Sequence, residues 1–278
     1  MRHSLDGSAL ALGLDLAKAP STRSADTSPQ LMDLVEATAA ATGAPLIDVG
    51  DGRRPGLGGL LRDIRRAHSR PWLIVRLTDR GGWTARRIRR AADDVRTRLD
   101  TDFLDHLLFP GGDPVAVDTA RALIADGIVG SVGIWDDGPG VPDIPGIPGR
   151  DHVGSHHRRC TTLSIQADLL GFDRLRPIFL AARETGKNPV FLRWDLRIPP
   201  AAVPLLAPLE AAAKDAGMTL PALGLGLPLY TPGVTAVLLP PDDPADTLEH
   251  IRGAVNLNPD SLIMRDFIDT GILGVSRC

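Results

Sequence analysis

Short apolar runs alternate along this chain with longer stretches in which apolar residues recur every third or fourth position. Runs rich in Val, Ile and Leu predict buried strands, whereas the recurring pattern predicts amphipathic helices. The runs predict eight strands, at residues 10–16, 45–50, 72–78, 103–110, 128–135, 162–169, 189–196 and 234–240.

Helices are predicted between most of these strands, because the intervening segments combine helical spacing with capping residues. Ser28 suits an N-cap, Pro29 the first helical position and Gly43 the position after the last turn. Residues 84–101 place apolar side chains on one face and arginines and aspartates on a solvated face. The same reasoning predicts helices in the second half of 46–66 and within 113–127, 172–186, 202–217 and 243–255.

Eight strands separated by helices predict a closed (β/α)8 barrel, the TIM-barrel architecture, because right-handed crossovers leave few other compact arrangements. We therefore expect residues 1–278 to form a single α/β domain. Residues 136–160 depart from the pattern, since their many prolines and glycines exclude a helix. This segment is predicted to be a long loop of the kind that covers the mouth of a barrel.

The composition bears on whether the protein binds nucleic acid or a membrane and on its expected location in the cell. A hydrophobic content of 43% and a net charge of -3 are typical of a soluble globular protein and give no basic surface for nucleic acid. No apolar stretch is long enough for a signal peptide or a membrane span, so a cytoplasmic location is expected. The two cysteines, Cys160 and Cys278, cannot supply a disulfide framework. The preference for arginine over lysine suggests a GC-rich bacterial genome, and the sequence leaves the oligomeric state open.

The order of several segments resembles the aldo/keto reductase superfamily over most of the chain. The segment "LIDVGDGRRPGLGGLLRDIRR" is similar to that family's aspartate-bearing second strand and the helix after it. Similar matches follow in order at residues 86–110, 124–136, 163–170 and 233–255. The resemblance implies a (β/α)8 barrel in which NADPH reduces a carbonyl group. It also implies a catalytic tetrad of aspartate, tyrosine, lysine and histidine, in which the lysine makes a phenol with a pKa of about 10 a usable acid.

Only one member of that tetrad is present. Asp48 matches the aspartate, but the tyrosine position falls at or next to Arg53 and the lysine position falls on Arg76. The histidine position falls near Pro110, and the only tyrosine, Tyr230, lies far along the chain. None of the three lysines is near the third strand. The standard reductase mechanism is therefore not expected.

The residues that the resemblance assigns to NADP(H) are also largely replaced. The serine and asparagine that would hold the nicotinamide amide fall on Trp135 and Asp136. The tyrosine that would stack on the ring falls near Arg193 or Trp194, which become candidate substrate-binding residues. Gln166 matches a glutamine that contacts the cofactor.

The last strand is followed by the sequence "PPDDP", where the resemblance places the phosphate-binding turn. Prolines donate no amide hydrogen and aspartates repel phosphate. The resemblance thus implies NADP(H) as the cofactor, while the residues themselves predict weak binding.

Two interpretations of the arginines remain open at this stage. Asp48 and Arg76 can form a structural ion pair, since buried charges persist when they are paired. Alternatively, Arg53, Arg76 and Arg193 converge at the strand ends and bind a carboxylate or phosphate with their planar guanidinium groups.

The other titratable residues are weaker candidates. His106 lies within the fourth predicted strand, where a hydrogen-bonded core histidine is more common than a catalytic base. Asp168 and Asp195 lie near strand ends and could act as general bases, cap helices or pair with arginines. No metal is predicted, because the spacing of one cluster of possible zinc ligands matches no metal motif: His152, His156, His157 and Cys160.

Taken together, the residues favour a divergent aldo/keto reductase-like barrel that binds or acts on a small anionic or carbonyl-bearing metabolite. In this hypothesis Asp48, Arg53 and Arg76 carry the chemistry without the standard tetrad. One alternative is an NADPH-dependent oxidoreductase with a different proton donor, and another is a scaffold without catalytic activity. The sequence does not decide whether the protein is an enzyme, and it names no substrate.

Overall fold

Eight parallel strands form a closed barrel, in which each strand pairs with the next along the chain and β8 pairs with β1. The structure is a computed structural model that describes residues 11–17, 29–42, 44–68, 70–79, 82–110, 114–136, 162–185, 190–198 and 200–257. The strands are β1 (Ala11–Asp15), β2 (Leu46–Asp48), β3 (Trp72–Arg76), β4 (Leu104–Pro110), β5 (Val129–Asp136), β6 (Thr162–Asp168), β7 (Val190–Asp195) and β8 (Ala236–Leu239).

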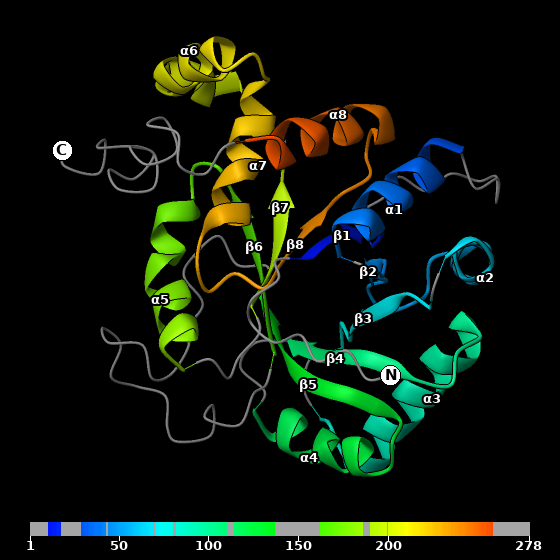
Figure 1. The fold of residues 1–278 in the computed structure, drawn as a ribbon. Coiled ribbons are helices and arrows are strands. Elements are labelled where there is room, and N and C mark those ends of the chain that lie inside the picture. Colours follow the sequence, from blue (N-terminus) through cyan, green and yellow to red (C-terminus); the bar gives the residue numbers. More distant parts are fainter. Residues whose placement is uncertain are drawn as a thin grey trace.

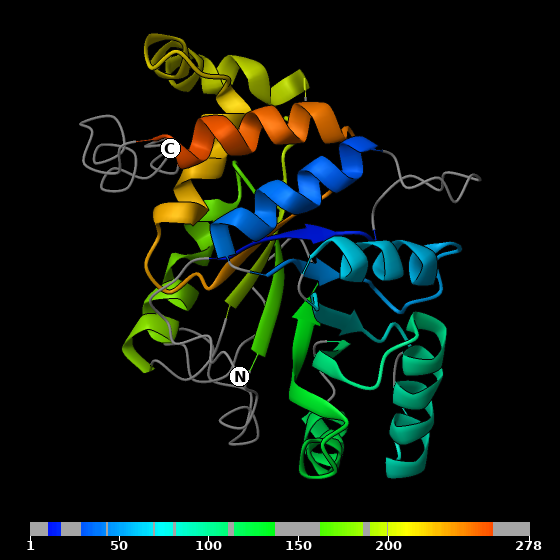
Figure 2. The same ribbon diagram turned by 45° about the vertical axis from the view of Figure 1, so that its right-hand side comes forward.

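The helices surround this barrel on the outside (Figures 1 and 2). The predicted (β/α)8 architecture is thereby confirmed, and each predicted strand overlaps an observed one. The helices are α1 (Pro29–Thr42), α2 (Leu57–Ala67), α3 (Ala85–Leu99), α4 (Pro114–Ala125), α5 (Arg176–Thr185), α6 (Ala207–Asp215), α7 (Leu220–Tyr230) and α8 (Pro244–Val255), with 3-10 turns η2 (Phe172–Leu175) and η3 (Pro200–Leu206) before α5 and α6.

Helix α7 was not predicted from the sequence, and its composition explains why. Residues 222–229 are all buried, so the helix has no polar face and no helical periodicity. It also contains Pro228 and two glycines, which ordinarily argue against a helix. Its N-terminus is marked by Thr219, whose side chain accepts a hydrogen bond from the Ala222 amide. In the figures α7 lies against α8, and the burial of both stabilises the helix (Figure 2).

Some sequence predictions fall on residues that the structure does not describe. Asp136, expected to begin the Pro/Gly-rich loop, is the last residue of β5, and residues 137–160 lie outside the described residues. The four possible zinc ligands lie in that same part. In the described portion of the chain, no group of three or more His, Cys, Asp or Glu side chains could hold a metal ion. Similarly, none of the described helices is long and apolar enough to cross a membrane.

Alternate residues of each strand point into the barrel, and this parity positions the site. One buried apolar cluster contains strand residues of a single parity and fills the barrel interior: Leu46, Ile74, Leu108, Trp135, Phe191, Ala236 and Leu238. The interior is tight at Gly133, where an added Cβ would overlap the Thr162 backbone. The residues two positions after Leu46, Ile74 and Phe191 also point into the barrel, and they are the charged residues at the carboxyl ends of these strands.

Candidate functional site

Five side chains from different strands form the inner layer at the carboxyl ends of the barrel strands: Asp15, Asp48, Arg76, Trp135 and Arg193. We call these five residues the barrel mouth. Each is the last or nearly the last residue of its strand, and each is less than a tenth exposed. Active sites of (β/α)8 barrels lie at this end. All but Asp15 were named from the sequence.

A buried arginine bridges two buried aspartates in the barrel mouth. The Nε atom of Arg76 lies 3.0 Å from Oδ1 and 2.8 Å from Oδ2 of Asp48. Its Nη2 atom donates to Oδ1 of Asp15 at 3.0 Å. The side chains of Asp15 and Asp48 are only 1% and 0% exposed. The predicted ion pair between Asp48 and Arg76 is present, and Asp15 makes it a group of three charges.

Backbone amides also donate to one oxygen of each carboxylate. Asp48 accepts a hydrogen bond from the amide of Gly50 at 2.9 Å, and Asp15 accepts one from Ala17 at 3.2 Å. The register of the barrel places Asp15 directly beside Asp48. Because a buried charge is tolerated when it is paired and hydrogen-bonded, this arrangement holds the Arg76 guanidinium in one position.

Trp135 lies between the two mouth arginines. The guanidinium carbons of Arg76 and Arg193 are each 5.7 Å from the centre of its ring. The Trp135 Nε1 atom donates to the Leu77 carbonyl at 3.0 Å, which fixes the ring, and Arg193 donates to the backbone carbonyl of Asp136. Arg76 and Arg193 therefore contact the same aromatic ring in the barrel mouth.

Arg53 does not join the barrel mouth. Its side chain is 64% exposed and its Nε atom lies 3.5 Å from a carboxylate oxygen of Asp51. The turn after β2 contains Gly50 and Gly52 with φ of 59° and 69°, conformations that favour glycine, and the chain leaves the barrel there. The three-arginine convergence expected from the sequence is thus not observed, because this turn carries Arg53 to the outside.

The other residues that the resemblance assigned to cofactor or substrate are divided between the inside and the outside of the barrel. Gln166 is half-buried and lies beside Arg193 in the sheet register, with the parity of the mouth residues. Trp194 has the opposite parity and points toward the helices, where its ring packs edge-on against Phe172 at 5.5 Å. Trp194 is therefore a core residue on the outer side of the sheet.

Asp168 and Asp195 both stabilise turns at strand ends. Oδ1 of Asp168 accepts a hydrogen bond from the Gly171 amide at 2.6 Å. Asp195 holds Arg197 through two contacts of 2.9 and 2.7 Å, and this carboxylate raises the pKa of the Arg197 guanidinium. Of the roles considered for them, turn capping and pairing with an arginine are the ones that the geometry shows.

His106 lies at the opposite, amino-terminal end of the barrel interior. Its Nδ1 atom is 2.6 Å from the Ser131 hydroxyl, and its ring packs edge-on against Phe191. Burial lowers its pKa from 6.5 to about 4, so the imidazole is neutral at physiological pH. His106 is the hydrogen-bonded core histidine that the sequence predicted.

The only tyrosine is used at the end of α8. The Tyr230 hydroxyl donates to the Leu257 carbonyl at 3.0 Å, and the Ala254 and Val255 carbonyls lie 3.4 Å away. The Ala254 and Val255 carbonyls belong to the last turn of α8, whose carbonyls have no partner within the helix. Burial raises the pKa of this phenol, which makes it a weaker acid. Tyr230 therefore has a structural role that is separate from the barrel mouth.

We predict that Tyr230→Phe lowers the free energy of unfolding by about 1 kcal/mol, the typical net value of one hydrogen bond. Ligand binding at the barrel mouth should be unchanged, because the hydroxyl that is removed donates to the chain at the end of α8. Urea unfolding measures the first effect, and calorimetric titration of a mouth ligand measures the second. Loss of ligand binding with unchanged stability would contradict the structural role.

The N-terminus of α8, where the resemblance places the cofactor phosphate, is capped by the chain itself. Oδ1 of Asp243 accepts hydrogen bonds from the amides of Ala245 at 3.1 Å and Asp246 at 3.2 Å. A helix N-terminus binds phosphate through such free amides. Here a carboxylate occupies them, Pro244 offers none, and Asp246 adds a second negative charge in the first turn. These residues do not fit the phosphate group of NADP(H).

Comparison with known proteins supports the fold. The sequence matches no protein-family model and none of the curated proteins. An aldo-keto reductase from Bacillus halodurans in its holo form superposes with a TM-score of 0.68 and 18% identity, covering 95% of this chain and 94% of that chain. An aldo/keto reductase from Klebsiella pneumoniae in complex with NADP and acetate gives 0.58 and 20%, covering 93% of this chain and 90% of that one. An aldo-keto reductase from a deep-sea metagenome library gives 0.62 and 14%, covering 92% and 89%. The chain has the aldo-keto reductase barrel fold.

Proposed function

We propose that this barrel binds a small anionic or carbonyl-bearing metabolite at its mouth and does not reduce it by the tyrosine and lysine relay. The observation that carries the proposal is Arg76, which takes the lysine position and is held there by Asp15 and Asp48. A guanidinium keeps its proton at physiological pH and cannot tune a proton donor as a lysine does. Within the described part of the chain, none of the five residues of the barrel mouth is a tyrosine, lysine or histidine.

Arg193 is the residue that we expect to hold the anionic group. Arg76 is bound by two carboxylates, and Arg193 is the second arginine of the barrel mouth. Its guanidinium lies over Trp135, whose apolar ring reduces competition from water. A planar guanidinium in such surroundings can bind a carboxylate or a carbonyl oxygen with two donors.

We expect this chain to bind the kind of small ligand seen in one structural relative but not the cofactor seen there. The Klebsiella protein holds both NADP and acetate. A carboxylate such as acetate suits the arginine-lined barrel mouth, whereas the Asp243 cap on α8 opposes the phosphate of NADP. We therefore propose binding of a small metabolite without a dinucleotide.

Titration calorimetry with acetate, pyruvate and NADPH tests this proposal on the intact protein. We expect saturable binding of a small carboxylate or 2-oxo acid and no binding of NADPH at micromolar concentrations. The variant Arg193→Gln should weaken binding of the small ligand at least about tenfold, since a charge-assisted hydrogen bond contributes roughly 1.5–3 kcal/mol.

Arg183→Gln is the matched control, because Arg183 is an exposed arginine on α5. It should leave the affinity unchanged. Micromolar binding of NADPH, or equal losses in the two variants, would contradict the proposed function. Oxidation of NADPH in the presence of an aldehyde would favour the oxidoreductase alternative instead.

A further inference from the structure

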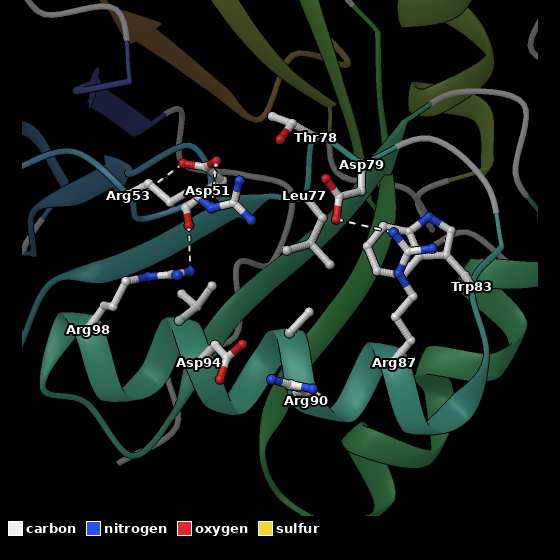
Figure 3. A pocket seen from close by; sticks show the side chains of 12 residues that line it. Asp51, Arg53, Leu77, Thr78, Asp79, Trp83, Arg87, Arg90, Asp94 and Arg98 are labelled. Atoms are coloured by element: carbon white, nitrogen blue, oxygen red, sulfur yellow. Dashed lines mark hydrogen bonds and ion pairs between the residues drawn. The ribbon is translucent and has the colours of Figure 1, made fainter.

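We propose that a pocket between α3 and the turns that follow β2 and β3 is a second ligand site, which binds the phosphate or carboxylate group of a small molecule. The pocket has a volume of about 260 Å³, enough for a small anion or one end of a metabolite. Figure 3 shows that α3 forms one side and the two turns form the other. We call it the α3 pocket.

The α3 pocket contains an excess of positive charge. Four arginines and three aspartates line it, namely Arg53, Arg87, Arg90, Arg98, Asp51, Asp79 and Asp94. Two of these aspartates are already paired, Asp51 with Arg53 at 3.5 Å and Asp79 with Arg87 at 3.3 Å (Figure 3). The third, Asp94, is one helical turn from both remaining arginines, so the pocket keeps a net positive charge.

The two remaining arginines present donors that no carboxylate uses. Among the residues that the structure describes, the side chain of Arg90 makes no hydrogen bond or ion pair. Arg98 uses Nη2 to donate to the Asp51 backbone carbonyl at 3.1 Å, which orients its guanidinium toward the turn after β2. Its Nε and Nη1 atoms have no acceptor within the described residues. These guanidinium donors suit an oxyanion with several acceptor oxygens.

Apart from Thr78, the remaining walls of the α3 pocket are apolar. Leu77, Ala91 and Val95 line it between the charged groups. Trp83 is buried, with its ring 5.0 Å from the Arg87 guanidinium carbon and edge-on to Phe109 at 5.3 Å. A charged group bound beside such surfaces is less hydrated than one on an open helix face, which strengthens its attraction to the arginines.

Helical spacing explains why the charged side chains of α3 line the pocket together. Arg87, Arg90, Asp94 and Arg98 follow one another at intervals of three or four residues, so they lie along one side of the helix. That side faces the turns after β2 and β3, and Figure 3 shows the four side chains lining the gap. Arg53, which the sequence assigned to the barrel mouth, belongs to this pocket instead.

The test is calorimetric titration of the intact protein with inorganic phosphate and, separately, malonate, at constant ionic strength. We expect saturable binding of at least one of these anions. The double variant R90A/R98A should weaken it at least about tenfold, since it removes two charged donors. Asp94→Asn should instead tighten binding by about two- to fivefold, because it removes a neighbouring negative charge. Both changes are on the exposed side of α3, so the fold should persist.

Two controls separate the α3 pocket from general charge effects and from the barrel mouth. Arg86 is exposed on the same helix but does not line the pocket, so Arg86→Ala should leave the affinity unchanged. Arg193→Gln should also leave it unchanged, so failure of this proposal and failure of the proposed function are distinguishable. Absence of saturable binding, equal losses in R86A and R90A/R98A, or no tightening in Asp94→Asn would each overturn the inference. Phosphate binding without malonate binding would show that the pocket favours a phosphate group over a carboxylate.

Discussion

Replacing Arg76 with methionine is expected to lower the free energy of unfolding by about 3–5 kcal/mol, the typical cost of removing one member of a buried ion pair. The change leaves the carboxylates of Asp15 and Asp48 side by side in the barrel interior, since the register pairs these two residues. Neither carboxylate has access to water, because their side chains are 1% and 0% exposed. Urea unfolding followed by circular dichroism measures the loss.

Two further variants make this result interpretable. Arg89 pairs with Asp126 at the surface, where both side chains are almost half exposed. Arg89→Met should therefore cost less than about 1 kcal/mol, as is usual for surface ion pairs. The combined change of Asp15→Asn, Asp48→Asn and Arg76→Met removes all three charges and should recover part of the stability, even if Arg76→Met alone does not fold. Similar losses for Arg76→Met and Arg89→Met would show that the mouth charges are not buried together.

The barrel was predictable because its strands are buried on both faces. The runs around Leu73, Leu107 and Leu192 are mostly apolar in sequence, as is typical of parallel strands covered by helices. Helix α7 was missed for the same physical reason. It is buried on every side, so it lacks the polar positions that reveal the period of a helix at the surface.

The site was predictable only where the position along a strand decides the direction of a side chain. Asp48, Arg76 and Arg193 lie within strands, and strand parity directs them into the barrel mouth. Asp15 also ends a strand, but its partner Arg76 lies on β3, and the sequence gives no local signal of that pairing. The aspartate within an otherwise apolar run was the one available indication.

For a residue in the turn after a strand, such as Arg53, the sequence position does not determine where the side chain lies. Arg53 follows β2 by five residues, yet the left-handed glycines at positions 50 and 52 decide where its side chain goes. A sequence indicates that such a turn is present, but the exit direction depends on the packing of α2 and α3 against the sheet. The residue therefore contributes to the α3 pocket and not to the barrel mouth.

The acid side of the stability curve is expected to depend on His106. Its pKa is lowered to about 4 in the folded protein from an ordinary value of 6.5. As the pH falls below about 6.5 the unfolded chain binds a proton at this residue while the folded chain does not, so the unfolded state is favoured. The stability lost between pH 6.5 and 4 through this one group is about 3 kcal/mol, at 1.36 kcal/mol for each pKa unit.

His106→Asn isolates this contribution, because the asparagine amide can keep the hydrogen bond to Ser131 and carries no titratable group. The free energy of unfolding of each protein is measured in urea from pH 7.5 to 4. Above about pH 6.5 the free energies of unfolding of the two proteins should differ by a constant amount. Below that pH the free energy of unfolding of the wild-type protein should fall relative to that of the variant. Burial raises the pKa of Asp105, so protonation of this residue stabilises the folded protein as the pH falls. This effect cancels in the comparison because Asp105 is present in both proteins. Parallel curves over the whole range would mean that the His106 ring is protonated without cost and so is not enclosed by Phe191 and the rest of the barrel interior.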